Sequence, residues 1–178
     1  FNYPKEGYWK DECIKYNFEF LTKVLKIPKT QIAYSEDVWN MPDFSAFGPN
    51  LESFAHGLEL VNSVFMQYYL KNGEIKELPI KVIDVGWGFD RLLWYYNGTN
   101  TVYDSVFPQQ IQFIKKKSGF KIDESLFNKY ATLSAKLDVE NALDIHGERE
   151  KIAKTIGTSL KQLNEQILPL QATYAVCD

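Results

Sequence analysis

The stretch "KVIDVGWGFDRLLWYYNG", residues 81–98, begins with alternating apolar residues and ends in a pattern typical of a helix. This order predicts a buried strand, a turn that contains glycine, and a helix. An acid, Asp84, lies near the end of the predicted strand, and an arginine, Arg91, lies near the start of the predicted helix. An aspartate at the end of a buried strand is desolvated, so we expect Asp84 to have a cationic partner.

The spacing Asp84-x-Gly86-x-Gly88 favours a ligand site at this turn. Glycines let a ligand approach the backbone closely, and the N-terminus of a helix attracts anions. The third glycine of the dinucleotide-binding fingerprint is missing, and strands do not alternate with helices, so a Rossmann fold is not indicated. The structural alternative for Asp84 is a helix cap for residues 86–88.

Arg91 is unusual in this chain because 18 of the 20 basic residues are lysines. Arginine offers a planar fork that binds a phosphate or a carboxylate through two hydrogen bonds, which lysine cannot do. The composition therefore favours an anion site at Arg91. The alternative, a salt bridge to a nearby acid, is equally compatible with the sequence.

Residues 1–100 indicate an antiparallel sheet that follows a helix. The segment 58–71 is rich in β-branched and aromatic residues and is predicted as a strand, which a second strand over 80–86 would pair with. The other predicted segments are a helix with Ile14, Phe18, Leu21 and Leu25 on one face, a short strand over 31–37, a long loop over 40–50 and a hairpin connection over 72–79.

After Pro108 the pattern becomes helical. Helices are predicted from Ile111 into Lys115–Lys117, over 123–138 with an aspartate cap, over 148–157 with a terminal glycine, and over 158–176 with a Thr/Ser cap. Twenty of the 27 aromatic residues precede residue 101, so we expect a boundary near residue 100. The fold class is therefore α+β.

Composition excludes several classes of protein. The 178 residues have a net charge of -3, which gives no footprint for nucleic acid, and no apolar run reaches the ~20 residues of a membrane span. Cys13 and Cys177 form no CxxC pair and are expected to be buried free thiols. His56 and His146 are interpreted as surface or core residues without a metal, and Lys115–Lys117 as a solvated charge run rather than an RNA contact.

Residues 82–108, "VIDVGWGFDRLLWYYNGTNTVYDSVFP", resemble the third class II motif of alanyl-tRNA synthetases of the archaeal type and the segment that follows it. Segments "EGYWKDE", "SEDVW", "GLELVNSVFMQYY" and "LPLQATYAVCD" resemble archaeal members in the same order. The resemblance implies part of a class II antiparallel sheet followed by a helical segment. It divides the chain into 1–107, the rear part of the catalytic domain, and 108–178, the start of the tRNA-recognition region.

The same resemblance implies roles for individual residues. Asp84 matches the acid that binds the substrate ammonium group, Asn62 an asparagine that holds the amino acid, and Gly86 the pocket floor. Further matches are Trp39 at the wall of the side-chain pocket, Arg91 with Gly88 at ATP, and Gly48 and Glu52 in a possible active-site loop. If Asn62 and Asp84 reach one ligand, a bulged or longer connection over 71–79 must bring them to the same face of the sheet.

The implied activity is that of an alanine–tRNA ligase. Its implied cofactors are ATP and Mg²⁺, and its implied partners are L-alanine, ATP and tRNA(Ala). The resemblance further implies a cytoplasmic protein without membrane contact, and a zinc site outside this chain. Because the first and second class II motifs are missing, the chain reads as a piece that is inactive by itself. The alternative is a non-catalytic module that binds RNA or protein on a synthetase-derived fold.

Overall fold

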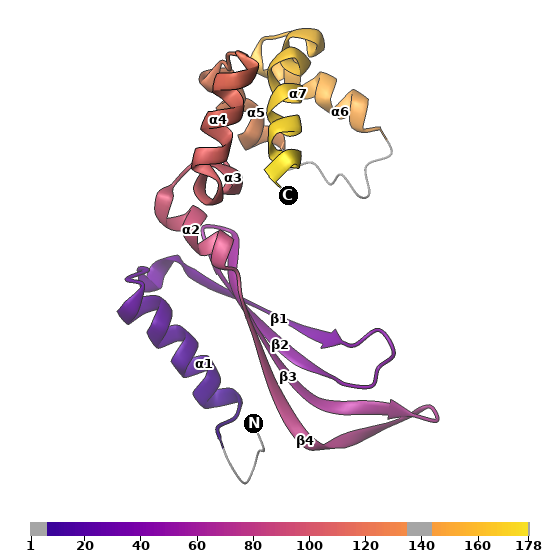
Figure 1. The fold of residues 1–178 in the computed structure, drawn as a ribbon. Helices are drawn as coiled ribbons and strands as arrows, with labels where there is room; N and C mark the ends of the chain where they lie inside the picture. The colour runs from indigo at the N-terminus through magenta and orange to yellow at the C-terminus, as the bar shows by residue number, and fades with distance from the viewer. Residues whose placement is uncertain (1–6, 135–143, 178) are drawn as a thin grey trace. The chain divides into compact units, whose positions relative to one another are not determined.

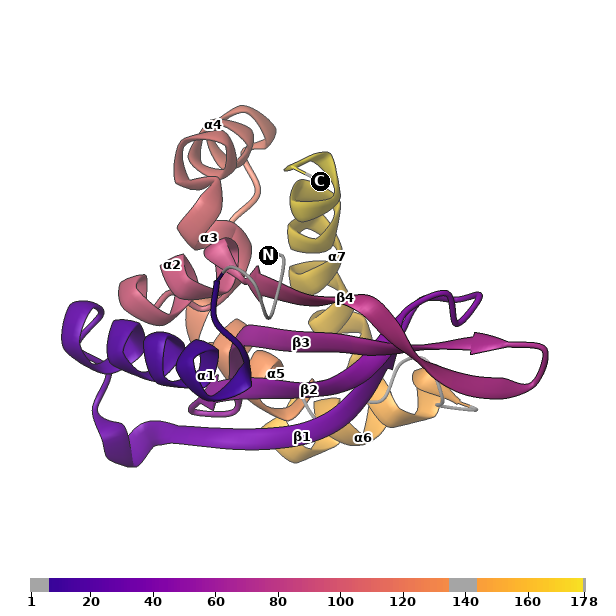
Figure 2. The same ribbon diagram turned by 90° about the horizontal axis from the view of Figure 1, so that it is seen from below.

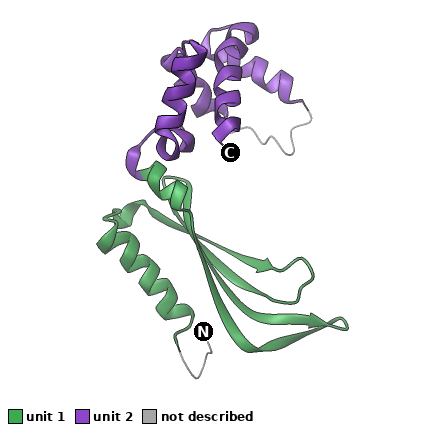
Figure 3. Cartoon of the chain, viewed as in Figure 1, with its two compact units in different colours: residues 1–95 green, residues 96–178 purple. Residues whose placement is uncertain are grey.

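The computed structural model describes residues 7–134 and 144–177, and the chain divides into two compact units, 1–95 and 96–178 (Figure 3). The first unit contains the sheet and the second contains helices, so the predicted α+β class is confirmed. The division lies close to the expected compositional boundary near residue 100. The finer assignment of 1–107 and 108–178 to two synthetase domains stays a prediction.

The elements are labelled in Figure 1. They are α1 Lys10–Glu19, the π-helical turn η1 Phe20–Val24, the 3-10 turn η2 Lys29–Gln31, β1 Ile32–Asn40, β2 Phe47–Ala55, β3 Leu58–Lys71, β4 Glu74–Trp87, α2 Phe89–Asn97, α3 Val102–Val106, α4 Pro108–Ser118, α5 Glu124–Ser134, α6 Ile145–Ile156 and α7 Leu160–Cys177.

The first unit is a four-stranded antiparallel sheet in the order β1-β2-β3-β4, in which each strand forms a hairpin with the next (Figures 1 and 2). Two-residue turns close two of the hairpins. His56-Gly57 joins β2 to β3 with φ angles of 52° and 80°, and Asn72-Gly73 joins β3 to β4 with φ angles of 54° and 78°. Two successive positive φ angles are what a tight hairpin turn requires, which explains the glycines.

Helix α1 covers one face of this sheet (Figure 2). The side chain of Asn17 donates from Nδ2 to Ser63 Oγ on β3 at 2.7 Å, and Trp9 contacts Phe65 edge to face. The buried residues of α1 are Cys13 and Asn17. Leu21, four residues further on in η1, is buried as well. The predicted face was therefore right at Leu21 but displaced by one residue at Ile14 and Phe18, which are only half-buried.

The predicted loop over 40–50 is wrong at both ends, because β1 runs to Asn40 and β2 begins at Phe47. Gly48 and Pro49, which suggested a loop, lie inside β2 where its pairing with β3 is interrupted between Phe47 and Asn50. A proline is tolerated in a strand at such an irregularity. A Cβ atom at Gly48 would overlap the carbonyl oxygen of Phe65, so the close approach of β3 requires glycine here.

The predicted connection over 72–79 is also wrong, because only Asn72-Gly73 lies outside the strands. β4 pairs with β3 on both sides of an irregularity in which Gln67 faces residues 78–81. β4 is moreover an edge strand and not a buried one, since Val82, Asp84 and Gly86 are exposed while the alternating residues are half-buried.

The second unit consists of helices with the predicted caps. Leu126 N–H donates to Asp123 Oδ1 at the start of α5, Gln162 N–H donates to Ser159 Oγ at the start of α7, and Gly157 ends α6 with a φ of 81°. The last four residues of the helix predicted over 123–138 lie outside the described residues.

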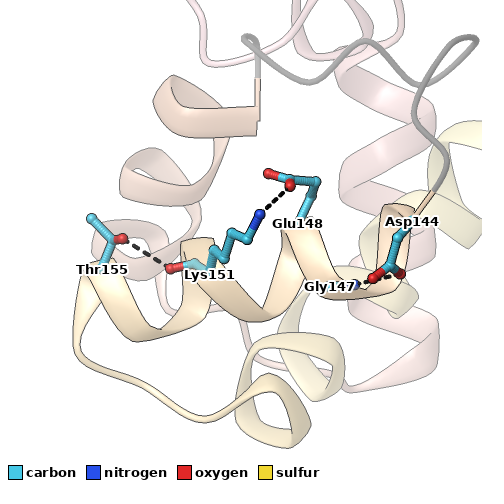
Figure 4. A network of polar contacts seen from close by, with 5 residues as sticks. All are labelled: Asp144, Gly147, Glu148, Lys151 and Thr155. Atoms are coloured by element: carbon cyan, nitrogen blue, oxygen red, sulfur yellow. Dashed lines mark hydrogen bonds and ion pairs between the residues drawn. The ribbon is translucent and has the colours of Figure 1, made fainter.

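At the start of α6, Asp144 Oδ1 accepts from Gly147 N–H at 2.8 Å (Figure 4). Asp144 therefore caps the helix, although the sequence pattern placed the helix start near residue 148. In the same unit, Tyr174 stacks on Tyr103 and donates from its hydroxyl to Asp104 Oδ2 at 3.3 Å. Burial raises the pKa of Tyr174 to about 12, so its phenol stays a hydrogen-bond donor.

Cys13 and Cys177 are free thiols, as expected, although Cys177 is only half-buried. Burial raises the pKa of the Cys13 thiol, which disfavours the reactive thiolate. None of the helices in the described part of the chain has the length and apolar character needed to cross a membrane.

Candidate active site

The strand register places the predicted amino-acid-binding residues on one face of the sheet. Residues directly opposite each other on neighbouring antiparallel strands point to the same side, about 5 Å apart. One row across the four strands is Ser35, Glu52, Asn62 and Gly86, and the next row is Asp37, Asn50, Val64 and Asp84. Trp39 and Gly48 oppose each other beside the second row. We call this surface the open face, because α1 packs on the other side.

Asn62 and Asp84 share this face because of the irregularity in β4. An uninterrupted ladder from the turn at Asn72-Gly73, which pairs Lys71 with Glu74, would set Asn62 opposite Ile83 and turn Asp84 to the α1 side. The observed partner of Asn62 is Gly86, three residues further along. The expected bulge is therefore present, although it lies beyond the tight turn and opposite Gln67.

The environment of Asp84 differs from the prediction. Its side chain is exposed on the edge strand instead of desolvated, so the fold itself does not demand a cationic partner. The alternative role as a helix cap is excluded, because β4 continues to Trp87 and the first bond of α2 runs from Leu92 N–H to Gly88 O. A solvent-accessible carboxylate on the open face is available to a ligand.

Asn62 is half-buried and bonded to its diagonal neighbour Asn50. Asn50 Nδ2 donates to Asn62 Oδ1 at 3.1 Å, and Asn50 is only 5 % exposed. The oxygen of the Asn50 amide, Oδ1, is buried without a hydrogen-bond partner among the described residues. Asn50 was not among the predicted site residues, because residues 40–50 were predicted as a loop. If residues 47–55 had been predicted as a strand, Asn50 would have been placed on the same face as Gly48 and Glu52, because every second residue of a strand points to the same side.

The three glycines of the predicted site have different surroundings. A Cβ atom at Gly86 would have Asn62 O as its nearest neighbour, at 4.0 Å, so the fold leaves this position open. At Gly88, a Cβ atom would lie 2.5 Å from Arg91 Nε, so glycine makes room for the arginine side chain. Gly48 and Glu52 lie in β2 and not in a loop, and the glycine is explained by β3 packing alone.

Arg91 forms an ion pair with Glu59 of β3, with 2.9 Å between Nη1 and Oε2. The salt bridge that was the alternative for Arg91 is thus present, and its partner, Glu59, was not predicted from the sequence. The Arg91 side chain remains 37 % exposed, and a guanidinium has five N–H donors, so the ion pair leaves donors for an anion.

The two rows contain three carboxylates, Asp37, Glu52 and Asp84, and no basic side chain. Of the three, Asp84 lies beside Asn62 and Gly86, and its carboxylate suits a ligand with an ammonium group. Among the described residues no three His, Cys, Asp or Glu side chains are close enough together to hold a metal ion. The open face therefore offers recognition of a cationic group and an amide contact, whereas Arg91 is the candidate for an anion.

Comparison with known proteins gives consistent relatives over the whole chain. The family described as tRNA synthetases class II (A) matches residues 1–175. An alanine–tRNA ligase of Methanocella arvoryzae is 38 % identical over 180 residues, which cover 100 % of this chain and 20 % of the relative. An alanine–tRNA ligase of Methanococcus maripaludis strain C5 is 37 % identical over 172 residues, 96 % of this chain and 19 % of the relative.

A third relative, an alanine–tRNA ligase of Thermococcus kodakarensis, is 35 % identical over 193 residues that cover 100 % of this chain and 21 % of the relative. The chain thus spans about a fifth of the length of the curated relatives that it matches. The match to the family extends through the sheet, the open face and nearly all of the helical unit. The chain therefore belongs to the class II (A) family of tRNA synthetases.

Proposed function

We propose that this chain is part of an alanine–tRNA ligase, which activates L-alanine with ATP and transfers it to tRNA(Ala). The observation that carries the proposal is the register that sets Asn62, Asp84 and Gly86 side by side on the open face. The relatives named alanine–tRNA ligase support the choice of amino acid.

In the proposed site, Asp84 binds the ammonium group of alanine and Asn62 binds the same amino acid through its amide. Gly86 forms the floor, since the fold leaves the space above it free. Trp39, half-buried opposite Gly48, forms the wall that limits the size of the side chain. The mechanism needs no nucleophilic side chain, because the carboxylate of alanine attacks the α-phosphorus of ATP and pyrophosphate leaves. The contribution of the protein is positioning and charge stabilisation.

Arg91 is proposed to bind the γ-phosphate of ATP, supported by its exposed guanidinium and by the space that Gly88 leaves for it. Mg²⁺ fits this scheme as an ion bound mainly by the phosphates, since the described residues offer no group of three ligands. We further propose that residues 1–107 belong to the catalytic domain and 108–178 to the tRNA-recognition region. A cytoplasmic location and a zinc site elsewhere in the longer protein complete the proposal.

The test is alanine-dependent exchange of pyrophosphate into ATP by the longer protein that contains this chain. Asp84→Asn should raise the KM for alanine by roughly 30-fold, because losing a charged hydrogen bond costs about 2 kcal/mol. Asp37→Asn is the matched control, because Asp37 is also exposed in the same row but lies on the far strand β1. A protein that binds RNA or another protein without any exchange would support the alternative, a non-catalytic module.

A further inference from the structure

Asn50 is a buried amide whose hydrogen bonding is only half satisfied. Its nitrogen donates to Asn62 Oδ1, while its own oxygen has no partner among the described residues. Folded proteins rarely leave buried polar atoms unpaired, so the free end of this amide calls for a reason beyond packing. Within the described part of the chain, the one side-chain hydrogen bond of Asn50 is directed at a residue of the proposed amino-acid site.

The position of Asn50 suits it to act through Asn62. Asn50 opposes Val64, Asn62 opposes Glu52, and all four side chains are on the open face. Asn50 is only 5 % exposed, whereas Asn62 is half-buried. It supplies the one side-chain hydrogen bond that Asn62 makes within the described part of the chain.

A carboxamide can present either its oxygen or its two N–H groups to a ligand. The bond from Asn50 holds the oxygen of Asn62 toward β2 and so fixes the orientation of the amide. The N–H groups of Asn62, which make no side-chain hydrogen bond within the described part of the chain, are then the ones available to a ligand. An N–H group binds a carboxylate oxygen and repels an ammonium group, which Asp84 is placed to accept. The two residues then recognise the two opposite charges of one amino acid.

We propose that Asn50 is a positioning residue, which fixes the amide of Asn62 so that its N–H groups bind the carboxylate of the amino-acid substrate. This inference rests on the proposed function. If so, residue 50 should determine how strongly the protein prefers a ligand with a carboxylate, such as alanine, over one with a hydroxyl in its place.

The variant Asn50→Asp separates orientation from packing, because aspartate has the same shape but cannot donate when ionised. It would accept from Asn62 Nδ2 and turn the oxygen of Asn62 toward the ligand. In the longer protein, we expect the KM for alanine to rise roughly 30-fold, as for loss of one charge-assisted hydrogen bond. Competitive inhibition by L-alaninol, whose hydroxyl can donate to that oxygen, should weaken much less. Asn50→Leu, which removes the amide without adding a charge, should also raise the KM for alanine.

The control variant is Asn17→Ala. Asn17 is also buried and donates to β3, but its partner is Ser63 on the α1 face. Asn17→Ala should lower the melting temperature. The ratio of the KM for alanine to the inhibition constant of alaninol should stay the same as in the wild type.

A double-mutant cycle decides whether Asn50 acts through Asn62. In the Asn62→Ala background, Asn50→Asp should cause no further rise in the KM for alanine. A full additional rise there, or an alanine KM within twofold of the wild-type value in both Asn50 single variants, would overturn the inference. If the wild-type protein exchanges pyrophosphate only with alanine, such a result leaves the proposed function intact. Absence of alanine-dependent exchange in the wild type would refute the proposed function and this inference together.

Discussion

Gly86 and Gly48 lie on the same face of the sheet, yet the fold requires glycine at only one of them. A Cβ atom would overlap the backbone of β3 at position 48, whereas at position 86 its nearest neighbour would be 4.0 Å away. If Gly86 is the floor of an amino-acid pocket, the ligand and not the fold demands glycine there.

Gly86→Ala should therefore leave the free energy of unfolding nearly unchanged and raise the KM for alanine. Gly48→Ala should lower the free energy of unfolding by about 1–3 kcal/mol, as overpacking does. Thermal melting and pyrophosphate exchange on both variants check this pair. A Gly86→Ala protein with normal KM would remove Gly86 from the proposed site.

Arg91 forms an ion pair with Glu59 and is proposed to contact ATP. Substitutions at these two residues distinguish the structural role of Arg91 from its role in ATP binding. Arg91→Lys keeps the charge and removes the fork, so ATP use should weaken by about 2 kcal/mol while alanine binding measured without ATP changes little. Glu59→Gln removes the ion pair of the same arginine and serves as the comparison.

A purely structural Arg91 would give a different result. Glu59→Gln would then lower the melting temperature at least as much as Arg91→Lys, and the dependence of exchange on ATP would stay normal in each. The measurement is therefore pyrophosphate exchange as a function of ATP, beside melting of the same two proteins.

At the level of elements, the sequence missed α3 and placed the start of α6 too late, but it predicted strand β3 and the other helices of the second unit well. These segments follow local rules, such as the Asp123 cap or the terminal Gly157. It failed at β2 and β4, where Gly48-Pro49 and Pro79 suggested loops. Both places are irregularities of strand pairing, and only the partner strand determines that a proline there is tolerated.

The open face could be predicted only in part, because it too depends on how the strands pair. The requirement that Asn62 and Asp84 share a ligand correctly predicted an irregular hairpin, which the register confirms. Asn50 and Glu59 escaped prediction because their importance lies in contacts with Asn62 and Arg91, and such contacts depend on the pairing of strands and on the path of α2. The exposure of Asp84 depends likewise on β4 being an edge strand.

Helix α6 provides a prediction about a single cap. Asp144→Ala removes the acceptor for Gly147 N–H and should lower the free energy of unfolding by about 1 kcal/mol. Urea denaturation measures the effect. Lys151→Ala is the control, because its ion pair with Glu148 lies on the exposed surface and its loss should leave the midpoint nearly unchanged. Equal losses in both variants would contradict the role of Asp144 as a cap.

For the whole molecule, the chain carries its own sheet and core, and its proposed contact with ATP rests on a single arginine. The two rows of the open face have no basic side chain, and Arg91 is the one cation proposed to contact phosphate. The isolated 178-residue chain should therefore fold cooperatively, by circular dichroism, and show no alanine-dependent pyrophosphate exchange. Exchange by the isolated chain would mean that these residues suffice for adenylate formation, contrary to our expectation.

The alternation along β4 has a consequence for large-scale mutagenesis. Ile83, Val85 and Trp87 are half-buried, and they alternate with the exposed Val82, Asp84 and Gly86. In a saturation library scored once for cellular abundance and once for growth, the odd-numbered codons of this strand should tolerate little in the abundance screen. Substitutions at the even-numbered positions Asp84 and Gly86 should leave abundance normal but should abolish growth. Two phenotypes would then be interleaved codon by codon within one short segment of the gene.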